Sequence, residues 1–282
     1  MRRLRRILTM ALCPLLATTM LAGCGPTARA TANMPEGPAI TIGVAADMPG
    51  LSRFHDGSYS GFDINVATYV ANQLGYAKKQ IIFRSVTAAN YQDKLSRRTV
   101  DFVAAPLPIG TGASSADATY AGPYLNAKQG LLIRTADTKR ITSTASLADR
   151  NVCTVTGSGA AASIQRRQPA AHIQERDTYL QCVTALLVGE ADAISGDDAA
   201  LAGLAANEGS AYLYVVSDTF GSSLHAISVK TGERALAAKI DTILKQMVRS
   251  ETWKSFAGQM SDQLRYTPSS KLNPPPIRSD NG

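Results

Sequence analysis

The sequence predicts an α/β fold built as two lobes with a cleft between them. Its 282 residues exceed a typical single domain of about 100 to 200 residues. Short apolar runs alternate along the chain with segments of helical periodicity, which is typical of parallel βαβ units. We expect two hinge crossovers, one near Gln129 and Gly130 and one within residues 217–222. Lobe 1 would then hold residues 39–129 and 221–264, and lobe 2 residues 130–220.

The chain opens with an arginine-rich start and an apolar run over residues 7–21 that is broken by Pro14. A transmembrane helix needs roughly 20 unbroken apolar residues, so residues 1–23 predict a cleaved signal peptide. The segment ends in LAGC, which resembles the bacterial lipobox and implies that Cys24 carries lipid. A plain secretory signal with an incidental cysteine is the alternative. Residues 24–38 are small, polar and proline-containing, which predicts a flexible tether.

The first strand-and-helix unit covers residues 40–76. Apolar residues alternate from Ile40 to Val44, which predicts a buried strand that ends at a loop where a ligand would sit. Asp63 precedes an apolar four-residue repeat, so we expect it to cap a helix that stops at Gly75. The other elements expected in lobe 1 are strands at 80–86 and 100–105, a helix at 91–97, an aperiodic segment at 106–119, and a strand within 120–134.

The second lobe repeats the alternation of strands and helices. In the helix expected at 178–189, Leu180, Val183 and Leu187 recur at helical spacing. The elements expected after residue 150 are strands at 152–155, 191–195, 212–216 and 224–229, and helices at 160–167, 178–189, 199–206, 233–247 and 252–260. Residues 265–282 include three consecutive prolines and predict a disordered tail.

Cysteine use suggests an oxidising compartment. Cys13 would leave with the signal peptide and Cys24 would carry lipid, which leaves Cys153 and Cys182 to form a disulfide. Two buried free thiols are the alternative. Closing a loop of about 30 residues should stabilise lobe 2 by roughly 3 to 4 kcal/mol. The three histidines show no ligand spacing with these cysteines, so no metal or cofactor is expected.

The formal charge of +7 overstates how basic the exported protein would be. Four of the 29 basic residues lie in the predicted signal peptide; removing them leaves 25 against 22 acidic residues, a charge of +3. The few aromatic residues are not interleaved with basic clusters, so no nucleic-acid partner is expected.

Three motifs connect this sequence with a known family. They are AADMPGL at 45–51, GFDINVA at 61–67 and YAGPY at 120–124. Together they resemble the extracellular solute-binding proteins of polar amino-acid ABC importers, and most of all the actinobacterial glutamate- and glutamine-type receptors. This resemblance, which covers roughly residues 40–264 in one register, implies a periplasmic-binding-protein type 2 fold and capture of a polar solute for an ABC permease. It further implies a monomer held by lipid on the extracytoplasmic face of the cell membrane.

Backbone and side-chain groups at two turns are candidates for binding an amino acid. The turn Gly157-Ser158-Gly159 joins a strand to a helix, and it matches the family turn whose amides hold the ligand α-carboxylate. The alternative is that the turn needs only glycine geometry. Asp197 matches the residue that accepts the ligand α-ammonium group, while Asp198 lies at the cleft edge and is expected to cap the following helix.

Lobe 1 supplies two weaker candidates. Asp47 matches a residue that touches ligand side chains, but it would suit a turn equally well. Phe54 could be an apolar floor for the ligand or a core residue. Where the family carries hydroxyl groups and a carboxylate-binding arginine, this chain has PLPIGTGA, with Ala113 at the arginine position. Another cation such as Arg53 must then reach the cleft, or the ligand lacks a free α-carboxylate, or affinity is weak.

Two further functions compete with solute capture for transport. The missing arginine favours a sensory or degenerate binding lipoprotein that signals to a membrane partner without transport. Some enzymes share this fold, but an enzyme needs a nucleophile and base or a paired acid and base in the cleft. No such arrangement is found in the sequence, so we expect a binding protein rather than an enzyme.

Overall fold

A computed structural model of the chain describes residues 34–107 and 118–277, in which strands and helices alternate. The signal peptide, Cys24, most of the tether and Ala113 therefore lie outside the described residues. The strands are β1 (Ile40–Val44), β2 (Asp47–Met48), β3 (Ser52–His55), β4 (Ser58–Ser60), β5 (Ile81–Ser85), β6 (Phe102–Leu107), β7 (Ala118–Arg134), β8 (Asn151–Val155), β9 (His172–Arg176), β10 (Ala193–Asp197), β11 (Leu213–Val215) and β12 (Phe220–Lys230). The α-helices are α1 (Phe62–Gln73), α2 (Tyr91–Ser96), α3 (Ala160–Arg167), α4 (Tyr179–Val188), α5 (Asp198–Glu208), α6 (Arg234–Arg249) and α7 (Thr252–Leu264).

The main sheet has the strand order β5-β1-β6-β12-β7-β10-β8-β9, and β11 pairs with β7. Strands β5, β1 and β6 are parallel to one another, as are β10, β8 and β9. The long strand β7 connects these two groups, because Gln129 lies opposite both Phe220 of β12 and Asp197 of β10. The chain thus passes from one group of parallel strands to the other at Gln129.

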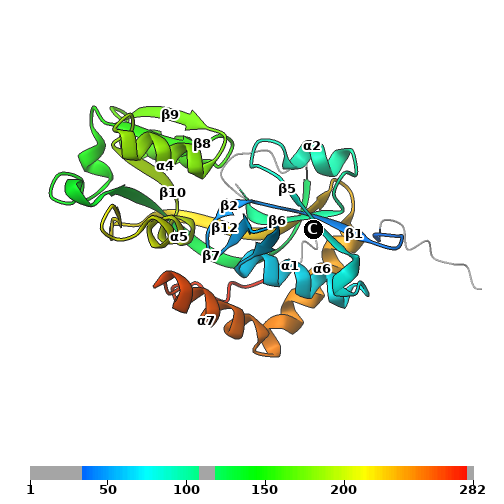
Figure 1. Cartoon of the computed structure of the whole chain (residues 1–282). Helices are drawn as coiled ribbons and strands as arrows, with labels where there is room; N and C mark the ends of the chain where they lie inside the picture. The colour runs from blue at the N-terminus through cyan, green and yellow to red at the C-terminus, as the bar shows by residue number, and fades with distance from the viewer. Residues whose placement is uncertain (1–33, 108–117, 278–282) are drawn as a thin grey trace, which may run out of the picture. The chain divides into compact units, whose positions relative to one another are not determined.

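Helices bury the apolar side chains of both groups of strands. Figure 1 shows α1, α6 and α7 on one side of β1, β6, β7 and β12, with α2 on the other side. Ile40, Ile42, Phe62 and Phe102 are fully or almost fully buried in the largest apolar cluster. Helix α3 packs on a second cluster that includes Leu131, Ile133 and Ile164. Burial of this kind stabilises the fold by about 25 cal/mol per Å² of apolar surface.

Two expectations for the first unit are wrong. The segment after β1 is not a plain loop, because β2, β3 and β4 form a small antiparallel sheet there. Asp63 does not cap α1: the cap position is Gly61, and Asp63 lies buried inside the first turn. Its carboxylate instead accepts hydrogen bonds from Tyr124 and His225. A tertiary contact therefore overrides the local capping preference.

In the second group of strands, β9 was missed and the face of α4 was misjudged. The residues of β9, HIQER, have no apolar run, which hides the strand from pattern analysis. On α4, the expected apolar residues Leu180 and Leu187 are exposed at 52% and 43%, whereas Cys182 and Leu186 are fully buried. Helix α4 begins and ends as expected, with Thr178 as N-cap and Gly189 as C-cap.

The expected disordered tail is wrong for residues 265–277. Tyr266 donates a hydrogen bond to Asp198 Oδ1 at 2.9 Å, and Asn273 bonds to the backbone of Asn126 at 2.9 Å in both directions. Ile277 packs on the largest apolar cluster. Helix α7 runs to Leu264, beyond the expected end at residue 260, and the segment after it folds back on the body.

The disulfide between Cys153 and Cys182 is present and links β8 to α4, with 5.5 Å between the two Cα atoms. Both residues are fully buried. The sequence separation of 29 residues makes the loop as long as expected.

Candidate functional site

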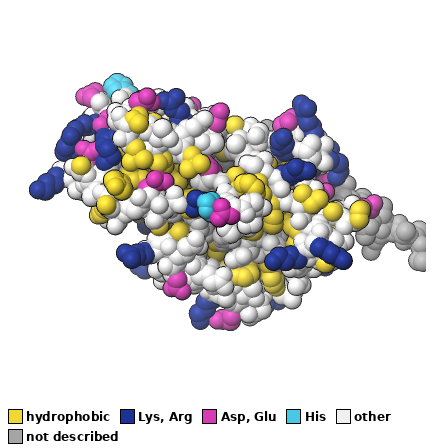
Figure 2. Space-filling view, viewed as in Figure 1, with side chains coloured by type: hydrophobic (Ala, Val, Ile, Leu, Met, Phe, Trp, Pro, Cys, Tyr) yellow, Lys and Arg dark blue, Asp and Glu magenta, His cyan; other side chains and the backbone are white. Residues whose placement is uncertain are grey.

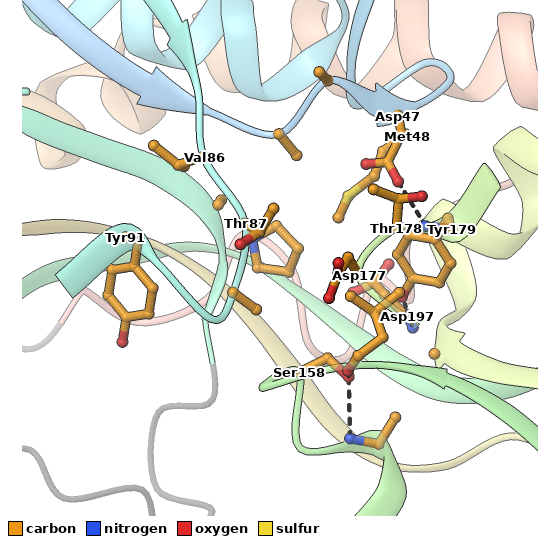
Figure 3. A pocket seen from close by; sticks show the side chains of 18 of the residues that line it. Asp47, Met48, Val86, Thr87, Tyr91, Ser158, Asp177, Thr178, Tyr179 and Asp197 are labelled. Carbon is orange, nitrogen blue, oxygen red and sulfur yellow. Dashed lines mark hydrogen bonds between the residues drawn. The ribbon is translucent and has the colours of Figure 1, made fainter. Parts of the chain in front are cut away.

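A cavity of about 100 Å³ lies where the parallel strands of both groups end. The carboxyl ends of such strands are the usual place for ligands in α/β sheets. Residues that follow β1 and β5 line it from one side, and residues that follow β8 and β9 or end β10 line it from the other. Figure 3 shows Asp47, Thr87, Asp177, Tyr179 and Asp197 around this cavity.

Asp47 closes one side of the cavity by contacting the start of α4. Its Oδ2 atom accepts a hydrogen bond from the backbone N–H of Tyr179 at 2.6 Å, drawn as a dashed line in Figure 3. The N-terminus of a helix carries unpaired N–H groups and a partial positive charge, which favours a carboxylate there. Burial raises the pKa of Asp47 above its usual value, although the backbone hydrogen bonds act in the opposite direction.

Asp197, and not Asp198 as predicted, is the N-cap of α5. Its Oδ1 atom accepts hydrogen bonds at 3.0 Å from the backbone N–H groups of Ala199 and Ala200. The other carboxylate oxygen lies 3.0 Å from Nε2 of His225. Asp197 is 2% exposed, and it lines the cavity. A carboxylate has about four lone-pair sites, so these three contacts leave about one unused.

His225 lies fully buried on β12 between two carboxylates. Its Nδ1 atom is 3.0 Å from Oδ1 of Asp63, and its Nε2 atom is 3.0 Å from Oδ2 of Asp197. Burial alone lowers the pKa of an imidazole, but the two negative charges and their hydrogen bonds outweigh it. Together they raise the pKa of His225 to about 10, so the ring is charged at neutral pH.

The predicted turn at residues 157–159 lies between β8 and α3, and Ser158 lines the cavity. Ser158 Oγ donates a hydrogen bond to the carbonyl of Val155 at 2.6 Å and accepts one from the N–H of Ala160 at 3.3 Å. Gly157 and Gly159 have φ angles of 77° and 78°, a region that favours glycine. A Cβ atom on Gly157 would lie only 3.1 Å from the backbone of Ala88. Backbone geometry and close packing therefore account for Gly157.

Two other predicted residues lie away from the cavity. Phe54 is 50% exposed, packs against Tyr59 with the two rings tilted by 50°, and is not part of the lining. Asp198 faces a different hollow, where its Oδ1 atom accepts hydrogen bonds from the N–H of Lys128 and the hydroxyl of Tyr266. Burial and the charge of Asp197 raise the pKa of Asp198 to about 6. The structure therefore brings together Asp47, Ser158 and Asp197, and leaves Phe54 and Asp198 apart.

Sequence reasoning missed several polar residues of this cavity, among them Asp177, Gln129 and Thr87. Asp177 follows β9 directly, and recognition of that strand would have placed it here. Gln129 is 7% exposed, and its Oε1 atom has no hydrogen-bond partner among the residues that the structure describes. Thr87 follows β5 and lies opposite Asp177 in Figure 3.

Charged side chains at this site are all acidic within the described ranges. Asp47, Asp177 and Asp197 line the cavity, and no lysine or arginine does. Arg53, the predicted substitute for the missing arginine, donates its hydrogen bond to Asn207 at 2.6 Å and does not line the cavity. Figure 2 shows the basic side chains dispersed over the visible face rather than gathered in one patch.

In residues 34–107 and 118–277, no group of histidine, cysteine and carboxylate side chains could hold a metal ion. The same part of the chain contains no helix that is both long and apolar enough to span a membrane.

Residues 40–259 match the bacterial extracellular solute-binding proteins, family 3. The glutamate-binding protein GluB of Corynebacterium efficiens is 31% identical over 227 residues, which covers 77% of this chain and 76% of that protein. The glutamine-binding protein GlnH of an ABC transporter of Bacillus subtilis is 29% identical over 258 residues, covering 86% of this chain and 93% of GlnH.

Solved structures support the predicted fold. The solute receptor for L-cysteine of Neisseria gonorrhoeae superposes with a TM-score of 0.72 at 22% identity, covering 84% of this chain and 94% of the receptor. An ancestral arginine-binding protein bound to glutamine gives a TM-score of 0.71 at 21% identity, covering 79% and 97%. These likenesses confirm the two-lobed α/β type 2 fold. The family match over residues 40–259 confirms the predicted relationship: this chain belongs to the bacterial extracellular solute-binding proteins, family 3.

Proposed function

We propose that this chain captures a small amine-bearing solute outside the cytoplasm and delivers it to an ABC permease. The observation that carries the proposal is the cavity between the two groups of strands. There Asp47, which follows β1, accepts a hydrogen bond from the start of α4, which follows β9. A ligand that binds both sides of this cavity would favour the closed state, which a permease can recognise.

The relatives support an amino acid such as glutamate or glutamine as the first class of ligand to test. In this proposal Asp197 and Asp47 accept hydrogen bonds from the ammonium group, since a charge-assisted bond in a desolvated site is stronger than a neutral one. Ser158 and the backbone of the turn at residues 157–159 contact the other end of the solute. The chain acts as a monomer, and lipid on Cys24 holds it on the extracytoplasmic face of the cell membrane.

The proposal includes no catalysis. Asp197 and His225 are an acid–base pair in the described part of the chain, but His225 is fully buried behind Asp197 and does not line the cavity. A general acid or base must come within hydrogen-bond reach of the substrate. That some enzymes share this fold is therefore no argument for catalytic activity in this chain.

Binding and uptake test the two halves of this proposal. Calorimetry with a panel of amino acids and small amines should find a ligand with a dissociation constant of about 1 μM or below, near −8 kcal/mol. Deleting the gene should abolish uptake of that ligand by cells. Uptake that survives the deletion, with binding intact, would support the signalling alternative. If no compound of the panel binds, solute capture is refuted for these classes of compound.

A further inference from the structure

At each of the three helices that begin at the cavity, an oxygen atom of the chain itself accepts a hydrogen bond from at least one N-terminal N–H group. Asp47 accepts from the first N–H of α4, and Thr178 Oγ1 accepts from the N–H of Gln181 in the same helix. Asp197 accepts from the N–H groups of Ala199 and Ala200 at the start of α5. At the start of α3, Ser158 Oγ accepts from the N–H of Ala160. Helix N-termini commonly bind anions, because their unpaired N–H groups point at the ligand. In this cavity the protein itself takes up many of those donors.

No side-chain cation is available to replace them. The described lining contains no lysine or arginine, and both ring nitrogens of His225 are already engaged by Asp63 and Asp197. The sequence from Pro106 to Tyr124, which includes residues outside the described ranges, contains no basic residue either. A ligand carboxylate would thus enter a site with three carboxylates, of which only Asp197 is paired with a cation, His225, and like charges repel.

Acceptors, in contrast, are free. No described residue donates a hydrogen bond to the carboxylate of Asp177, which Figure 3 places between Thr87 and Tyr179. The Oε1 atom of Gln129 is buried, and it too lacks a partner within the described residues. A buried acceptor without a donor costs about 1 to 3 kcal/mol, so a ligand N–H at this position would be favourable. The polar groups of the site therefore favour a ligand that carries hydrogen-bond donors and a positive charge.

We propose that the ligand is an organic cation, an amine or a guanidine, that carries no free carboxylate. This inference rests on the proposed function of solute capture and changes the chemical class of the solute. Asp177 and Asp47 face its positive end, Gln129 accepts one of its N–H groups, and Val86 and Val103 contact its carbon chain. A cavity of about 100 Å³ has room for roughly seven to ten water-sized groups, so the ligand is small.

Pairs of compounds that differ only by a carboxylate test this inference. Calorimetry on the purified exported protein should compare agmatine with arginine, cadaverine with lysine, and 4-aminobutanamide with glutamine. At least one amine should bind about tenfold or more tightly than its parent amino acid, because the parent places a fourth carboxylate in the site.

Asp177→Asn is the diagnostic variant. Asp177 is exposed to solvent, so the variant should fold, and it should weaken binding of the best amine about tenfold. Affinity for the parent amino acid should stay unchanged or rise. Glu175→Gln is the matched control: it is an exposed carboxylate on β9 that does not line the cavity, and its removal should change nothing.

Three outcomes would overturn the inference, and they can be told apart. If an amino acid binds and every matching amine binds more weakly, solute capture stands and the absence of a carboxylate is wrong. If no amino acid and no amine binds, the inference fails together with the proposed function. Equal loss of amine binding in Asp177→Asn and Glu175→Gln would also count against it, since a nonspecific field rather than the cavity would then hold the cation.

Discussion

Replacing His225 by glutamine should remove a pH-dependent part of the stability of this protein. His225 is fully buried and lies 3.0 Å from both Asp63 and Asp197. Glutamine keeps a polar side chain of similar length but cannot carry the positive charge. Breaking a buried ion pair by removing one partner typically costs about 3 to 5 kcal/mol, because the other charge is left uncompensated.

The pKa of His225 gives an independent estimate of this effect. Its pKa is raised from 6.5 to about 10 in the folded protein, because the charges of Asp63 and Asp197 outweigh the opposing effect of burial. At about 1.4 kcal/mol per pH unit, this interval corresponds to roughly 5 kcal/mol. A raised pKa in the folded state means that the stabilisation is complete below pH 6.5 and is lost as the pH rises through about 10.

Urea unfolding from pH 6 to pH 9.5 measures this contribution. The free energy of unfolding of the wild type should fall by up to about 1.4 kcal/mol per pH unit above the unfolded-state pKa of the ring. In His225→Gln the slope should be absent, and the two proteins should converge near the upper end. His172→Gln, which removes an exposed histidine on β9, is the control and should keep the wild-type slope. Parallel pH profiles for the wild type and His225→Gln would refute the reasoning.

Three further predictions follow from the same structure. Changing Cys153 and Cys182 together to serine should lower the free energy of urea unfolding by about 3 to 4 kcal/mol; an unchanged value would contradict the disulfide contribution. Gly157→Ala should lower it by about 1 to 2 kcal/mol, since Gly157 has a positive φ and little space for a methyl group, and a neutral result would oppose this. Cys24→Ala should release the protein into the medium or leave it unprocessed, as immunoblots of membrane and medium would show; a processed, membrane-bound variant would disprove lipid attachment.

Local sequence patterns predicted the elements whose boundaries depend on local chemistry. Helix α3 covers the expected residues 160–167, because a glycine turn precedes it and a polar segment ends it. Helix α4 begins at Thr178 and ends at Gly189 as expected, since threonine and glycine are strong cap signals. The disulfide was predictable from compartment and cysteine count. The polar strands β3, β4 and β9 have no comparable signal, because their pairing depends on neighbours rather than on an apolar run.

Tertiary partners decided the roles of the aspartates, and the sequence held no sign of those partners. Asp197 and Asp198 are adjacent, so either could have capped α5 on local grounds. His225, which is 28 residues further along the chain, bonds to Oδ2 of Asp197. This contact holds the carboxylate with its Oδ1 atom at the cap of α5. Asp63 was expected to cap α1 for the same local reason, but the other side of the same histidine ring pairs with it. Long-range charge pairing with His225 thus assigned the roles of Asp63 and Asp197, whereas Asp198 is held by hydrogen bonds from Lys128 N–H and the Tyr266 hydroxyl.

Two of the interactions that join the groups of strands lie at different places and should respond differently to opening of the cleft. Asp197, which bonds to His225, is opposite Gln129, where β7 changes from one group of strands to the other. A contact at such a crossing moves little when the lobes rotate about it. The bond from Tyr179 N–H to Asp47 joins α4 to the segment after β1, away from that crossing, and must break when the cleft opens. We therefore expect His225 to govern the stability of the body, and Asp47 to govern the balance between its open and closed states.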